Sequence, residues 1–88
     1  MCTNIATKVR IAGSAKARDR WYAVDEAVIG FDHASQVWAE HALRLDVYAS
    51  GDESAGHVAL EVDLASAKRL LAQLAEVIDA AERSGVAE

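Results

Sequence analysis

The sequence predicts one α+β domain over residues 1–88: a four-stranded antiparallel sheet, arranged as a meander, with one C-terminal amphipathic helix packed on one face. Two patterns predict it. Before residue 63, apolar and polar residues alternate over four segments, which is the period of a strand with one buried face. After residue 63, apolar residues recur with the period of a helix. Because 88 residues bury one modest core, a second domain is excluded.

The first two predicted strands cover residues 5–11 and 21–32. In the first, isoleucine and valine alternate with lysine and arginine, and the second starts at Trp21, which is expected in the core. The segment 13–20 between them is polar, opens with glycine and has no apolar residue larger than alanine, so it predicts an exposed loop. Gly30 interrupts the second strand and indicates a bulge or a close approach of another strand.

The third and fourth predicted strands cover residues 42–49 and 57–62. Both alternate apolar and polar residues, and the cluster Ser-Gly-Asp-Glu-Ser-Ala-Gly between them is typical of a turn, so the two strands are expected to form a hairpin. The segment 34–40 joins the second strand to the third. It predicts a loop with a packed tip, in which Trp38 serves as a lid.

The helix is predicted to run from residue 64 to about residue 84, because leucine, valine, isoleucine and alanine form one apolar stripe along it. Asp63 is the expected N-cap and Gly85 the expected C-terminal stop. The sheet face turned away from the helix still carries apolar residues, which are Tyr22, Val24, Val28, Tyr48 and Ala59. A homodimer through that face and a solvated amphipathic face are equally good interpretations.

The composition excludes several classes of partner. The formal net charge of −5 disfavours nucleic acids and anionic membranes, which a negative surface repels. No apolar run approaches the roughly 18 residues that span a bilayer, and the N-terminal segment lacks the apolar stretch of a signal peptide, so a cytoplasmic protein is expected. Cys2 is the only cysteine, which rules out an internal disulfide.

A cluster of metal-ligating residue types is expected at one end of the sheet. If the strands on either side of residues 34–40 form a hairpin, His33 and His41 fall opposite one another, where paired Cβ atoms are about 4.5 to 5.5 Å apart. The first strand returns Cys2 toward the same end. With the carboxylate of Asp32 or Glu40, these residues could hold zinc or iron and leave one position for water or substrate.

One feature weighs against this metal site, and two other candidate sites have less support than it does. By strict alternation Cys2 belongs to the face opposite Ile5, so its convergence on the histidines needs a twist or bulge. The basic residues of 13–20 could take a phosphate or carboxylate, but they lack the spacing of a P-loop and suit a solvated hairpin tip better. No serine or cysteine lies in a recognisable triad order, so classical hydrolase chemistry is unsupported.

Two classes of function therefore remain. The first is a metal-binding protein, or a metal-dependent enzyme acting on a small molecule, in which Cys2, His33 and His41 ligate the ion and Glu40 acts as a base or orients a ligand. The second is a non-catalytic interaction module, homodimeric or accessory to another protein, whose histidines are structural. Metal analysis of the purified protein separates the two.

Several short motifs resemble an uncharacterised family of small, mostly actinobacterial proteins. The motifs are Met1-Cys2-Thr3, the Gly13-Ser14-Ala15-Lys16 run, Trp21, Phe31-Asp32-His33, Glu40-His41-Ala42-Leu43 and Val58-Ala59-Leu60-Glu61. The resemblance spans nearly the whole chain and implies an architecture and a recurring residue set, with no described reaction. The chain departs from the family pattern at Gln36, where a further histidine is expected, and at Ala34 and Trp38, where prolines are usual. If that histidine is a ligand, glutamine makes a weaker or altered site.

Overall fold

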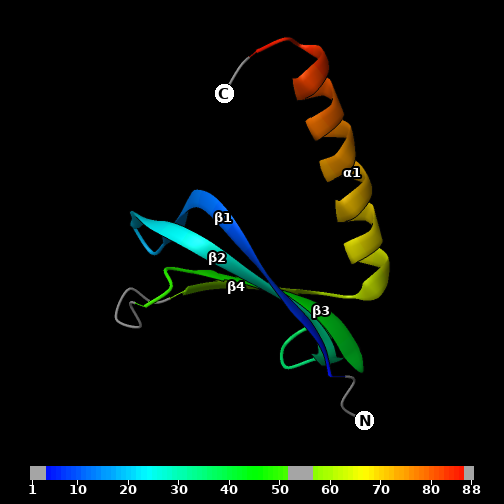
Figure 1. Ribbon diagram of the computed structural model, residues 1–88. Coiled ribbons are helices and arrows are strands. Elements are labelled where there is room, and N and C mark those ends of the chain that lie inside the picture. Colours follow the sequence, from blue (N-terminus) through cyan, green and yellow to red (C-terminus); the bar gives the residue numbers. More distant parts are fainter. Residues whose placement is uncertain (1–3, 52–56, 87–88) are drawn as a thin grey trace.

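The computed structural model describes residues 4–51 and 57–86, which form an antiparallel sheet and one helix (Figure 1). The elements are β1 (Ile5–Ala17), β2 (Arg20–His33), β3 (His41–Tyr48), β4 (His57–Val62) and α1 (Leu64–Arg83). Within these residues the sheet has four strands in the order β1-β2-β3-β4, each antiparallel to its neighbour. The predicted fold class, a meander followed by a C-terminal helix, is confirmed.

The β1–β2 hairpin is longer than the sequence suggested. The predicted loop over residues 13–20 is wrong, because β1 continues to Ala17 and only Arg18 and Asp19 form the turn, with Arg18 in the left-handed region at φ 60°. Pairing with β2 satisfies the backbone groups of these polar residues, so the segment needs no large apolar side chain to extend the sheet. The register shifts between Arg10 and Gly13, which places the irregularity in β1.

Gly30 marks a close approach between strands. A Cβ atom added there would lie 3.1 Å from the backbone oxygen of Ile5. The glycine therefore lets β1 come near β2 just before the Ile5–Phe31 pair. The prediction of a close approach is confirmed, while the bulge lies on the other strand of the hairpin.

The buried core within the described residues is small. It consists of Ala15, Val24, Ala27 and Ala42, each no more than 8% exposed. Trp21, expected in the core, is 66% exposed, because it lies near the turn of the long β1–β2 hairpin. One sheet face gathers larger apolar residues from β3 and β4 in the pairs Leu43–Val62, Leu45–Leu60 and Val47–Val58. We call it the apolar face.

Helix α1 begins and ends at the predicted caps. The side chain of Asp63 accepts a hydrogen bond from the backbone N–H of Ser66 at 2.7 Å, which satisfies one of the unpaired donors of the first turn. At the other end Gly85 takes a left-handed conformation with φ 75°, which glycine adopts without strain. Both cap predictions are confirmed.

The packing of α1 differs from the expectation. The helix was predicted to cover one face of the sheet, but it contacts the sheet mainly at β3, and Figure 1 shows it rising from the end of β4 and projecting beyond the strands. No residue of α1 is buried. Helical periodicity indicates which face of a helix is apolar, whereas the direction of α1 is set by its short connection to β4. The predicted cover is therefore not formed within one chain.

Candidate functional site

His33 and His41 form the last pair of residues between β2 and β3. Their ring centroids are 4.7 Å apart and their planes differ by 28°, so the rings are stacked. The ring of Phe31 also stacks on His41, at a centroid distance of 5.7 Å. The predicted register of this hairpin is confirmed, and it brings the two imidazoles together at the rim of the apolar face.

The loop over residues 34–40 closes directly behind the histidines. The backbone N–H of Ala34 donates to the carbonyl oxygen of Glu40 at 3.1 Å, which adds one more bond beyond the His33–His41 pair. At the tip, Ala39 donates its N–H to the carbonyl of Val37 at 2.8 Å. The loop thereby fixes the separation of the two strand ends that carry the imidazoles.

Glu61, on β4, holds this loop against the sheet. Its carboxylate accepts the backbone N–H groups of Ser35 at 2.9 Å, Gln36 at 2.7 Å and Val37 at 2.8 Å. The hydroxyl of Ser35 donates to the same carboxylate at 3.0 Å. Successive N–H groups that converge on one point make an anion-binding concavity, and here the anion is part of the protein. The bonds from Ser35, Val37 and Gln36 lower the pKa of Glu61 from 4.5 to about 2.

Sequence reasoning missed the role of Glu61. The alternation of residues along β4 correctly places Glu61 on the face opposite the apolar one. Its partners, however, lie 24 to 26 residues away in the chain, in a loop whose path no local motif describes. Only the register of three strands together brings this carboxylate under the loop. Glu61 is therefore the principal addition that the structure makes to the candidate site.

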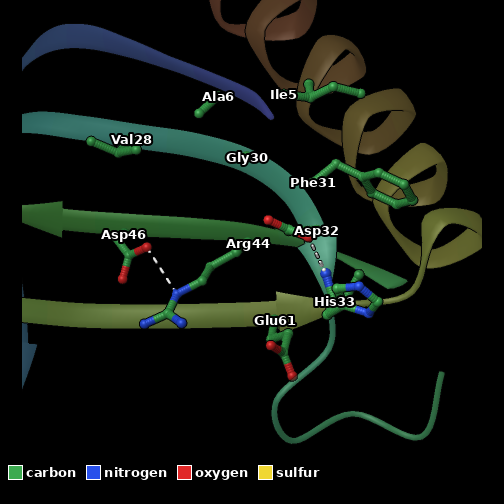
Figure 2. Close-up of a pocket in the computed structure, with 11 residues that line it drawn as sticks. Ile5, Ala6, Val28, Gly30, Phe31, Asp32, His33, Arg44, Asp46 and Glu61 are labelled. Carbon is green, nitrogen blue, oxygen red and sulfur yellow. Dashed lines mark hydrogen bonds and ion pairs between the residues drawn. The ribbon is translucent and has the colours of Figure 1, made fainter. Parts of the chain in front are cut away.

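A shallow pocket of about 480 Å³ opens beside the histidines and is lined mainly by residues of the face opposite the apolar one (Figure 2). Its charged residues already have partners. Arg44 donates to Asp46 at 3.0 Å, Asp32 accepts the backbone N–H of His33 at 2.7 Å, and Glu61 is bound to the loop. Since a ligand would have to displace these bonds, the pocket is a weaker candidate than the histidine pair.

The comparison with protein families gives a match over nearly the whole chain. The model of a family of unknown function, DUF6295, matches residues 1–87. The chain belongs to this family. No curated protein and no solved structure matches it. Because the DUF6295 match covers every described residue, the histidine pair, the loop and Glu61 all lie within the family's domain.

The other predicted site residues fall in different places. Cys2 lies outside the described residues. Glu40 is exposed in the loop, and its carboxylate makes no hydrogen bond or ion pair with the described residues. Asp32 and His33 point to different sides of β2, as adjacent strand residues do, so Asp32 faces the pocket (Figure 2). Trp38 is 101% exposed, which contradicts the packed loop tip, because the bonds to Glu61 hold the loop by its backbone instead.

Within residues 4–51 and 57–86, no three histidine, cysteine, aspartate or glutamate side chains are grouped to hold a metal ion. Of the predicted ligands, the described residues bring together two, the imidazoles of His33 and His41. The same part of the chain contains no helix long and apolar enough to cross a membrane.

Proposed function

We propose that this protein binds a divalent metal ion, zinc or iron, through His33 and His41, with Cys2 as the third protein ligand. The observation that supports it is the stacked histidine pair at a strand end whose loop is fixed by Glu61. Imidazole and thiolate suit both ions, and a site with three protein ligands keeps one position for water or substrate. β1 pairs with β2 up to the Ile5–Phe31 pair, two residues before His33, and Cys2 lies three residues upstream of Ile5.

The ring orientation sets a condition on this site. Nitrogen lone pairs lie in the ring planes, so two stacked rings inclined by 28° hold their lone pairs in two nearly parallel planes that do not meet at one ion. A shared ion about 2.0–2.1 Å from each nitrogen requires one ring to turn about its χ2 bond. His33 is exposed at the end of β2, so its ring can turn without displacing a buried side chain. Metal binding and ring rotation are therefore coupled in the proposal.

In the proposal, Glu40 acts as the general base. It directly precedes His41, and its exposed carboxylate makes no bond with the described residues. A metal-bound water loses a proton far more easily than bulk water, and a nearby carboxylate can accept that proton. This supports an enzyme acting on a small molecule. We place the protein in the cytoplasm, where a single cysteine stays reduced, with neither nucleic acid nor membrane as partner.

Titration of the purified, metal-free protein with zinc tests the proposal. Calorimetry should show one ion per chain, and His33→Ala, His41→Ala and Cys2→Ala should each weaken binding at least about tenfold, because each removes one ligand. Affinity should also fall as the pH drops, since protons compete with the metal for the same atoms. His57→Ala is the matched control, because His57 pairs with Tyr48 at the opposite end of β3.

The control variant should bind zinc as the wild type does. A wild-type protein that takes up neither zinc nor iron, and whose melting temperature neither ion changes, would rule the metal site out. The histidines would then be structural, and the alternative function, a non-catalytic interaction module, would remain. That alternative has its own support in the exposed apolar residues of α1.

A further inference from the structure

Helix α1 presents an apolar stripe that the chain itself leaves open. The stripe's large members are all 49% to 68% exposed, namely Leu64, Leu70, Leu71, Leu74, Val77 and Ile78. From Leu64 to Ala81 the apolar residues are spaced alternately three and four apart, at Leu64, Ala67, Leu71, Leu74, Ile78 and Ala81. This spacing is the heptad pattern by which one helix packs along another.

The sheet of the same chain does not close over this stripe. One residue, Asp63, separates the end of β4 from the start of α1. Its side chain is bound to the N–H of Ser66 and its carbonyl to the N–H of Ala67, at 2.7 and 2.9 Å. These two bonds lie within the cap and first turn of α1, so the helix starts one residue after the strand ends. In the structure the helix points away from the strands (Figure 1) and none of its residues is buried, so a cover for its stripe comes from outside the chain.

The surface area indicates how much cover is missing. A compact monomer of 9.4 kDa exposes about 5,000 Å², whereas this chain exposes 7087 Å². Its radius of gyration is 14.8 Å, against about 12 Å for a compact domain of this length. The open stripe of α1 is one source of this excess, and a stable interface needs roughly 800 Å² from each partner. An extended chain with an open apolar helix is the shape expected of a subunit that buries this surface against a partner.

The charges on α1 favour a second copy of the same helix in the opposite direction. The first half of the helix, 64–73, carries Lys68 and Arg69 and no acidic residue. The second half, 74–83, carries three acidic residues and one arginine. Antiparallel packing of two such helices places each basic half beside an acidic half, whereas parallel packing places like charges together.

We propose that two copies of this chain form a symmetric homodimer in which the α1 helices pack antiparallel through their apolar stripes. This interface differs from the one that the sequence suggested. On the sheet face expected to be open, Val24 is buried and Tyr22, Val28 and Tyr48 are half-buried, whereas no residue of the helix expected to be covered is buried. A twofold axis makes the interface self-complementary, so the assembly closes at two copies. The dimer does not depend on metal binding.

Sedimentation equilibrium at micromolar concentration tests the dimer. The wild type should have about twice the 9.4 kDa chain mass. Leu71→Glu should raise the dissociation constant at least about tenfold, because it places a charge in the centre of the stripe. The control Ala72→Glu adds the same charge one residue further along, off the stripe, and should leave the dimer intact. A monomeric wild type, or equal effects of the two variants, contradicts the proposal.

Charge reversal tests the helix direction and avoids the apolar residues on which folding depends. At low salt, Lys68→Glu should weaken the dimer, and adding Glu82→Lys should restore it, because both residues border the apolar stripe. Circular dichroism confirms that each variant is helical. Failure of Glu82→Lys to restore association would contradict antiparallel packing, and a dimer indifferent to both changes would place the interface elsewhere.

Discussion

Replacing Glu61 by alanine should lower the zinc affinity of this protein by about 10- to 100-fold, although Glu61 itself is not a proposed ligand. The loss is typical of residues that orient the ligands of a metal. Glu61 accepts three backbone N–H groups and one hydroxyl from residues 35–37, and this loop holds His33 opposite His41. Without the carboxylate, three adjacent N–H groups lose their shared acceptor and the loop becomes free to rearrange.

Two measurements on Glu61→Ala separate its effect on the loop from its effect on zinc affinity. Amide hydrogen exchange at Ser35, Gln36 and Val37 should become faster in Glu61→Ala even in the absence of metal, because these are the donors that the carboxylate engages. Glu82→Ala is the control, because Glu82 lies on α1, away from this loop. Faster exchange with unchanged zinc affinity would show that the loop does not position the ligands. Unchanged exchange would show that Glu61 does not hold the loop.

Acid should destabilise the wild type more than it destabilises Glu61→Gln. The pKa of Glu61 is lowered from 4.5 to about 2 in the folded protein by the backbone N–H groups of Ser35, Val37 and Gln36. A carboxylate with a depressed pKa stabilises the folded state above its unfolded pKa, and the contribution is lost as the pH falls toward the folded value. Glu61 therefore contributes fully above about pH 4.5 and no longer below about pH 2.

The difference between the two proteins amounts to about one proton taken up on unfolding. Near pH 3 the unfolded chain has Glu61 mostly protonated and the folded chain has it mostly ionised, so wild-type unfolding should take up about one proton more than unfolding of Glu61→Gln. Thermal melts at several pH values between 3 and 6 measure this difference. Asp25 and Asp63 also have lowered pKa values, through the N–H groups of Ser50 and Ser66. Their contribution to the pH dependence of stability is the same in both proteins. Parallel pH profiles would contradict the bonds to Glu61.

The parts of the fold that local patterns determine could be predicted from the sequence. Alternation located the four strands, and the change of period after Asp63 located the helix with both of its caps. The facing positions of His33 and His41 followed from a hairpin across residues 34–40, because antiparallel register is fixed once the loop is known. The histidine pair of the candidate site could therefore be predicted from the sequence.

The remaining features depend on contacts that local patterns do not contain. Residues 13–17 have no apolar signal, and they extend β1 because β2 offers them backbone partners. The apolar stripe of α1 was visible, but periodicity does not say whether a sheet or a second chain covers it. Glu61 looked like any polar strand residue, since its loop partners lie 24 to 26 residues away. In each case the decisive partner is distant in the sequence.

X-ray absorption at the zinc edge of the zinc-loaded protein tests the metal site most directly. The proposal predicts a first shell with nitrogen at about 2.0–2.1 Å and one sulfur at about 2.3 Å, together with the outer-shell scattering of two imidazoles. His33→Ala should remove one imidazole from that pattern and Cys2→Ala should remove the sulfur. A shell made of oxygen alone, with neither imidazole scattering nor sulfur, would contradict the site.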